Sequence, residues 1–175
     1  MTYKSKSITL SIAICMLAGL AIALFNGVFG TSAKNIEQDA RKSQKIDSSW
    51  EVSMSVSESL GALIFYNETL NDYTYSIYLN RKGFSFGYDF SSGGSNSGII
   101  DGIREFRYDT YGSALISMNK DKVAKIELYN GIKVTNIDVN PAKPFAIVIP
   151  VNCGSITLFD INGNVTPITE IGVNG

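Results

Sequence analysis

Three carboxylates recur at intervals of four residues along one short segment of the chain. They are Asp101, Glu105 and Asp109, and Asp72 and Asp89 precede them in the sequence. Most glycoside hydrolases use two carboxylates that face each other across a cleft as acid and base. The segment therefore raises one enzymatic hypothesis, a carboxylate-dependent hydrolase acting on extracellular glycan. Solvated surface acids are the default interpretation of such residues.

The chain of 175 residues contains no histidine. Histidine is the commonest general base, the commonest zinc ligand and the usual partner of a serine or cysteine nucleophile. Ser113, Ser117 and Ser155 have no such partner, and Cys153 is interpreted as a small buried hydrophobe. We therefore expect no catalytic residue, no metal and no cofactor.

Oxygen-bearing side chains at Asp160, Asn162 and Asn164 resemble the start of a calcium-binding loop. An EF-hand loop beginning at Asp160 would need glycine at its sixth position and glutamate at its twelfth, where this chain has Val165 and Ile171. The Asn162-Gly163 pair instead favours a hairpin turn.

Aromatic residues are frequent between residues 66 and 111, where they could stack on sugars or contact a protein partner. Most of them are expected in the core. Strand ends and turns leave side chains accessible, so the candidate binding residues are Tyr66, Tyr78 and Tyr111. The candidate ligands are a protein or a cell-wall glycan.

The segment Ile8 to Phe29 holds 22 residues without a charge, and about 20 apolar residues suffice for a helix to cross a membrane. Lys4 and Lys6 precede it, which favours an N-terminus inside the cell. We expect an uncleaved single-pass anchor with the C-terminal domain outside the cytoplasm. The alternative is a signal peptide cleaved after Ala33, which would secrete the domain.

Charge argues against nucleic acid as a partner. Without Lys4 and Lys6, 13 of the 15 basic residues remain against 16 acidic ones, a balance of −3. Binding to a duplex needs a dense basic patch, and the basic residues here are scattered.

Composition divides the chain into three parts. Residues 1–30 form a cytoplasmic stub and the hydrophobic segment, and 31–49 read as a polar tether. Residues 50–175 form the extracytoplasmic domain, which begins where apolar and polar residues alternate from Trp50 to Val56.

The same alternation predicts further short strands, separated by turns. SSGGSNSG over Ser91–Gly98 has the composition of a flexible loop, and Asn119–Lys122, Asn130-Gly131 and Asn162-Gly163 are typical of hairpin turns. The expected strands cover 62–66, 73–79, 83–90, 102–108, 113–118, 123–129, 133–139, 145–151, 155–159 and 165–168.

Short strands at this spacing predict a mainly β fold, an antiparallel β-sandwich of two sheets preceded by one N-terminal hydrophobic helix. The run ITLFDINGNVTPI over Ile156–Ile168 resembles parts of bacterial immunoglobulin-like modules, which implies an immunoglobulin-like fold and no particular function. A jelly-roll-like order is the other form considered.

The leading functional hypothesis is a membrane-anchored or secreted binding or accessory protein at the cell surface, without enzymatic activity. The glycan hydrolase is the alternative.

Overall fold

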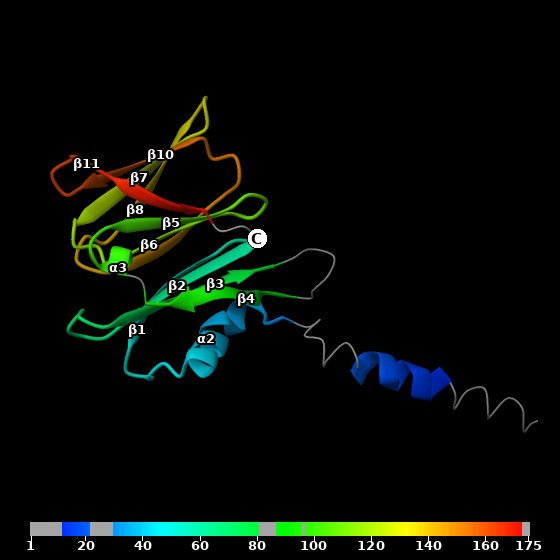
Figure 1. The fold of residues 1–175 in the computed structure, drawn as a ribbon. Coiled ribbons are helices and arrows are strands. Elements are labelled where there is room, and N and C mark those ends of the chain that lie inside the picture. Colours follow the sequence, from blue (N-terminus) through cyan, green and yellow to red (C-terminus); the bar gives the residue numbers. More distant parts are fainter. Residues whose placement is uncertain (1–11, 22–29, 81–86, 96, 173–175) are drawn as a thin grey trace, which may run out of the picture.

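The computed structural model describes residues 12–21, 30–80, 87–95 and 97–172. In this part of the chain the fold is mainly β, with twelve strands in three four-stranded sheets (Figure 1). Residues 12–21 are helical, are exposed along their whole length and lie apart from the strands. The rest of the expected hydrophobic segment, 8–11 and 22–29, lies outside the described residues. Among the helices that are described, none has the length and apolar character to cross a membrane.

The first sheet, here called the N-terminal sheet, is a simple antiparallel meander in the order β1-β2-β3-β4. Strand β2 is buried along its whole length because both faces of the sheet are covered. The strands are β1 (Glu51–Val56), β2 (Leu60–Tyr66), β3 (Tyr73–Leu79) and β4 (Asp89–Gly94).

Two helical segments, η1 (Ala33–Asn35) and α2 (Ile36–Gln44), precede this sheet, and α2 packs on its outer face. Ile36 and Ala40 are fully buried there, four residues apart and hence on one side of the helix. The expectation of a polar tether over 31–49 is therefore wrong. Most residues of this segment are charged or polar. Its apolar stripe is so narrow that it can be recognised only together with the sheet surface that it covers.

The middle sheet lies between the other two and has the order β12-β5-β6-β9. Strand β6 is buried throughout, and β12 runs parallel to β5 while the other pairs are antiparallel. Its strands are β5 (Ile103–Tyr108), β6 (Gly112–Ser117), β9 (Phe145–Ile149) and β12 (Ile168–Gly172), and α3 (Ser97–Ile100) precedes β5.

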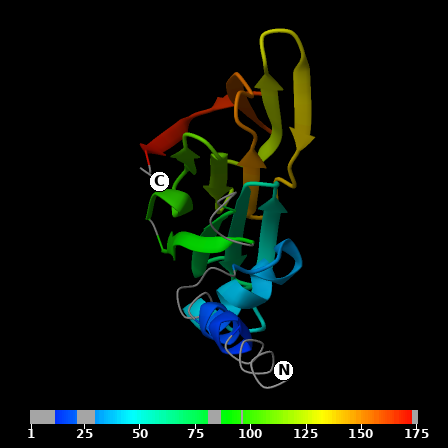
Figure 2. The ribbon, with the colours of Figure 1, turned by 90° about the vertical axis from the view of Figure 1, so that its right-hand side faces the viewer.

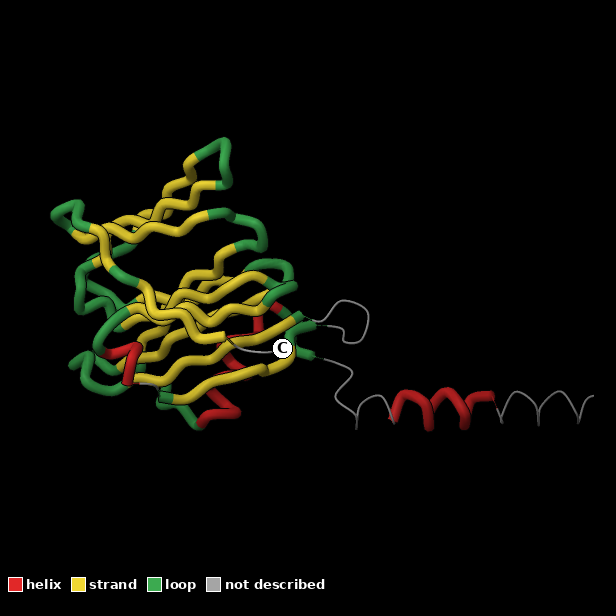
Figure 3. Tube along the Cα trace, turned by 45° about the horizontal axis from the view of Figure 1, so that its top comes forward, coloured by secondary structure: helices red, strands yellow, loops and turns green. Residues whose placement is uncertain are grey.

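Small side chains let the N-terminal and middle sheets approach each other. Ala62, Ala114 and Ala146 are buried in the core between them, together with larger residues such as Ile64 and Ile116. Figure 3 shows the sheets as successive layers of strands.

The outer sheet has the order β11-β10-β7-β8 and covers the other face of the middle sheet. Val123, Ile126 and Leu158 point inward and pack with Leu115 and Ile149. The β7–β8 hairpin projects beyond the rest of the body (Figure 2). The strands are β7 (Val123–Tyr129), β8 (Val134–Asp138), β10 (Ser155–Asp160) and β11 (Val165–Thr166).

Several sequence expectations are confirmed, and others are wrong. The strands at 73–79 and 123–129 have the expected bounds, and hairpins form at Asn130-Gly131 and Asn162-Gly163. The expected strand over 83–90 lies partly outside the described residues.

Two expected loops have a different structure. Ser91–Gly98 is not a loop along its length, because β4 continues to Gly94 and α3 begins at Ser97. Asn119–Lys122 is not a hairpin turn, because it carries the chain from the middle sheet to the outer sheet. Composition shows that a turn occurs but not which sheets it joins.

Candidate functional site

The three tyrosines singled out in the sequence lie in different places. Tyr66 is buried, and its hydroxyl donates to Glu51 Oε2 at 3.1 Å. Tyr78 is completely buried beneath α2, where its hydroxyl donates to Asp39 Oδ2 at 2.8 Å and burial raises its pKa. The expectation that Tyr66 and Tyr78 are exposed is therefore wrong, because neighbouring layers of the structure cover the strand ends at which they lie.

Tyr111 is half-buried in the turn between β5 and β6 and lines a shallow recess with Ser59 and Asn80. Its backbone carbonyl accepts a hydrogen bond from Ser59 Oγ at 3.0 Å. The structure brings none of the three tyrosines together, and a binding role for them stays a prediction.

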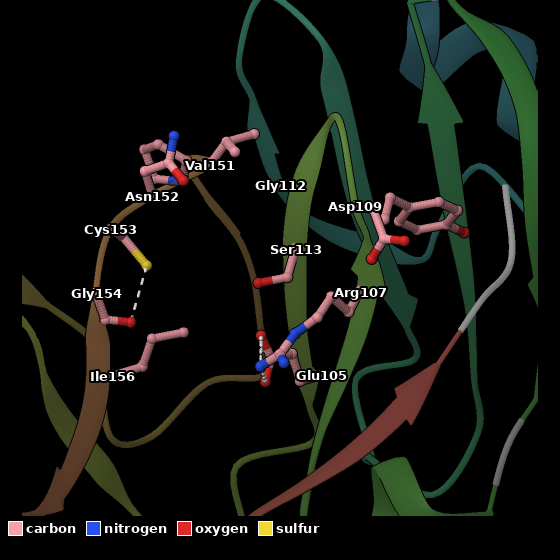
Figure 4. Close-up of a pocket in the computed structure, with 12 residues that line it drawn as sticks. Glu105, Arg107, Asp109, Gly112, Ser113, Val151, Asn152, Cys153, Gly154 and Ile156 are labelled. Carbon is pink, nitrogen blue, oxygen red and sulfur yellow. Dashed lines mark hydrogen bonds and ion pairs between the residues drawn. The ribbon is translucent and has the colours of Figure 1, made fainter.

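A polar pocket of about 390 Å³ opens where the turn between β5 and β6 meets the connection from β9 to β10 (Figure 4). It includes two of the carboxylates noted in the sequence and the half-buried thiol of Cys153. Its lining residues are Glu105, Arg107, Tyr108, Asp109, Gly112, Ser113, Pro150, Val151, Asn152, Cys153, Gly154 and Ile156.

An ion pair dominates this polar pocket. Glu105 is only 3% exposed, and Arg107 Nη2 donates to its two carboxylate oxygens at 3.3 and 3.2 Å. Alternate residues on a strand share a face, so β5 presents both groups to the same side. Arg107 thus compensates the buried charge, which would otherwise be costly.

Two further groups face the polar pocket in Figure 4. Ser113 is 5% exposed, and its hydroxyl makes no hydrogen bond with another described residue. Burial raises the pKa of the Cys153 thiol, whose Sγ lies 3.8 Å from the carbonyl oxygen of Gly154. A raised pKa keeps the sulfur protonated at neutral pH, so Cys153 is a poor nucleophile.

Glu105 and Asp109 both line the polar pocket, as the hydrolase hypothesis requires, but no contact joins the two carboxylates within the described residues. A general acid must deliver a proton to the leaving group, and both carboxylate oxygens of Glu105 are instead in contact with Arg107. The polar pocket can offer hydrogen bonds to a small polar molecule.

A second depression, the edge groove, runs between β1 and the segment from β8 to β9 and encloses about 490 Å³. Three sheets contribute an edge strand to it. Its lining residues are Glu51, Val52, Ser53, Met54, Ser55, Tyr66, Ile137, Asp138, Val139, Asn140, Lys143, Pro144, Phe145, Ala146, Ile147 and Val148.

A charged cluster belongs to the edge groove. Lys143 Nζ lies 2.8 Å from Glu51 Oε2, which also accepts the hydroxyl of Tyr66. The hydrogen bonds from Lys143 and then Tyr66 lower the pKa of Glu51, and Glu51 raises the pKa of Lys143. Sequence reasoning missed this cluster because Glu51 and Lys143 are 92 residues apart.

The hairpin at Asp160 is closed by its own side chain. Asp160 Oδ1 accepts the backbone N–H groups of Asn162 and Asn164, both at 2.8 Å. The prediction of a hairpin turn at Asn162-Gly163 is confirmed. Within the described residues no group of three or more histidine, cysteine or acidic side chains could hold a metal ion.

No protein-family model, no curated protein and no solved structure matches this chain. A functional proposal therefore rests on the chemistry of its own residues.

Proposed function

We propose that the protein is a membrane-anchored binding or accessory module, without enzymatic activity, whose β-rich body lies outside the cytoplasm. Its body would be an antiparallel β-sandwich extended by a third sheet. The membrane would be reached through the hydrophobic segment Ile8 to Phe29, and the partner would be a protein or a cell-wall glycan.

The observation that carries this proposal is the helix at 12–21. Its apolar side chains point into solvent, with Met16 71% and Leu17 66% exposed. A helix of a soluble body would bury such residues, and contiguous exposed apolar surface is typical of a membrane or protein contact. The uncharged residues that flank this helix in the sequence bring the segment to the length of a membrane span.

The start of the body supports the uncleaved form over the secreted one. The backbone of Thr31 pairs with that of Tyr88 through two hydrogen bonds. Cleavage after Ala33 would remove Thr31 and this bridge. An uncleaved chain keeps the body attached directly to its anchor.

Binding has more support than the glycan hydrolase alternative. In the polar pocket, Arg107 occupies both carboxylate oxygens of the buried Glu105, so this group does not face a second carboxylate as a glycosidase acid would. The edge groove offers a long surface with apolar and charged parts, as recognition sites do.

Membrane partition of the full chain tests the proposal. The Leu17→Lys variant places a charge in the hydrophobic segment, where a lysine costs about 3 kcal/mol near the centre of a span. We expect the unmodified chain to stay in the membrane after alkaline washing and Leu17→Lys to appear largely in the soluble fraction. The matched control is Ile132→Lys, at the hairpin tip, where the isoleucine is 94% exposed.

Protease added outside intact cells completes the test. It should degrade the body of the unmodified chain while leaving a membrane-embedded fragment. Recovery of the full-length unmodified chain in the soluble fraction would refute the anchor, and full protection of the body would refute its placement outside.

A further inference from the structure

We propose that the edge groove binds an extended polypeptide strand of a partner protein, which adds to the free edge of β1 and carries a basic residue beside Asp138. This inference rests on the proposed binding function and specifies its site and the chemistry of its partner.

The first step is the direction of the backbone groups of β1. The N–H of Ser57 donates to the carbonyl of Leu60 at 2.8 Å, at the hairpin end of the β1–β2 pair. Hydrogen-bonded positions alternate along an antiparallel pair, so the N–H and C=O groups of Val52, Met54 and Val56 point away from β2. Among the described strands, β1 pairs with β2 only, and β9 contacts β1 through a hydrogen bond from the Ala146 N–H to Ser53 Oγ. No described strand pairs with the outer edge of β1.

The unpaired outer edge of β1 indicates which kind of ligand the edge groove can bind. Outward donors and acceptors recur every two residues, about 7 Å apart along the strand. An extended polypeptide presents its own groups at the same interval, which is the basis of recognition by strand addition. A glycan has no such repeat of paired donors and acceptors.

Apart from Glu51 at its start, β1 contains no charged residue that would protect this edge. Exposed edge strands commonly contain lysine or proline, which prevents pairing with other chains. Strand β1 reads EVSMSV and contains neither, and Met54 at its middle is exposed.

The residues on the opposite wall of the edge groove indicate which side chains the added strand would carry. Ile137, Val139 and Ile147 are half-buried apolar residues lining this wall. Alternate residues of a strand share one face, so every second residue of the partner would contact them. The partner segment is therefore apolar at alternate positions.

The charge of the edge groove indicates that the partner segment carries a basic residue. Glu51 in the edge groove is paired with Lys143. Asp138 also lines the groove and is exposed, and no ion pair joins it to another described residue. The groove therefore carries a surplus negative charge at Asp138, which favours lysine or arginine in the partner.

The test uses the full chain in detergent micelles and a synthetic peptide, acetyl-KVTVTVK-amide, with a lysine at each end because the strand direction is open. Trp50 is the only tryptophan and directly precedes β1, so its fluorescence reports binding. We expect a saturable fluorescence change. Amide hydrogen exchange should slow at Val52, Met54 and Val56. The same peptide with N-methyl groups on alternate residues should not bind, because it lacks the backbone donors.

Two variants probe the two halves of the proposal. Met54→Pro removes an outward N–H that β2 does not use, and it should weaken binding at least about tenfold. Asp138→Lys should also weaken binding about tenfold, through charge repulsion. The matched control is Asp121→Lys, an exposed acid in the connection from β6 to β7, which should leave the affinity unchanged.

Other outcomes would overturn the inference. No saturable change up to about 1 mM peptide, or slowed exchange confined to residues outside β1, would exclude strand addition here. Unchanged affinity of the Asp138→Lys variant would show that the partner needs no basic residue beside Asp138. Self-association that Met54→Pro abolishes would show that a second copy of this chain occupies the edge. None of these results affects the membrane partition that tests the anchor, so the two proposals can fail separately.

Discussion

Thr31 and Tyr88, 57 positions apart in the sequence, form an isolated antiparallel bridge in which each backbone N–H donates to the other residue's carbonyl at 2.8 Å. This bridge fixes the start of the folded body next to β4. The segment after the hydrophobic residues is therefore part of the body.

Glycine at position 87 permits the close approach of the bridge. Its φ is +128°, and a Cβ there would lie 2.6 Å from the carbonyl oxygen of Thr31. Gly94 has a similar φ of +126° but open space around its Cβ position. Gly94→Ala should cost about 1–2 kcal/mol from backbone strain alone. Gly87→Ala should cost more and accelerate amide exchange at Thr31. Urea unfolding measures both variants, and equal losses would show that the bridge contributes nothing.

Arg41 joins α2 to the chain that follows it. Its guanidinium bonds with Glu37 and with the backbone carbonyls of Asp47 and Trp50, and it lies 4.9 Å from the centre of the Phe65 ring. Arg41→Ala should lower the free energy of unfolding by about 1.5–3 kcal/mol and shift the emission of Trp50. Its neighbour Lys42 is exposed, so Lys42→Ala serves as the control. A loss of similar size in both variants would argue against docking of α2.

Asn119 connects two crossovers between the middle and outer sheets. Its buried amide nitrogen donates to the carbonyls of Val123, Asn140 and Lys143 at 3.1–3.2 Å. Its φ of +57° is one that glycine adopts readily. Asn119→Gly therefore removes the side-chain bonds without straining the backbone, and it should cost about 2–3 kcal/mol in urea unfolding. Asn136→Ala, on the exposed strand β8, should change stability far less.

Glu51 should make stability depend on pH. Hydrogen bonds from Lys143 and Tyr66 lower its pKa in the folded protein below the ordinary value of 4.5. Its contribution is therefore present above about pH 4.5 and is lost as the pH falls through the lowered pKa. Glu51→Gln should be less stable than the unmodified chain at pH 7, and this difference should shrink towards pH 3.

Urea midpoints measured between pH 7 and pH 3 check the role of Glu51. The exposed acid Glu68 provides the control, because Glu68→Gln removes a carboxylate outside the edge groove. A difference that stays constant across this range would show that the contacts of Glu51 do not favour its charged form.

Short-range patterns made most strands predictable. The alternation in Tyr73–Leu79 and the Asn-Gly pairs at 130 and 162 depend on neighbours within a few residues, and both types of prediction are confirmed. Helix α2 was missed because its stripe consists of Ile36 and Ala40 alone, among polar residues that suggest a tether. A stripe that short has no clear signal until the surface that it covers is known.

The candidate sites depended on long-range contacts and were only partly predictable. Glu105, Asp109, Ser113 and Cys153 could be picked out in the sequence as residues able to do chemistry, but their presence in one pocket could not be predicted. The edge groove was missed entirely, because its walls come from edge strands of three different sheets.

By itself the sequence determined the mainly β character of the chain, most of its strands and two hairpin turns, since these depend on local alternation and on residues suited to tight turns. The tertiary structure alone decided that three sheets form, that α2 belongs to the body, and that the strand-end tyrosines Tyr66 and Tyr78 are buried. The physical reason is that burial and strand order depend on which surfaces meet, and contacts between residues far apart in the sequence leave no periodic signal in it.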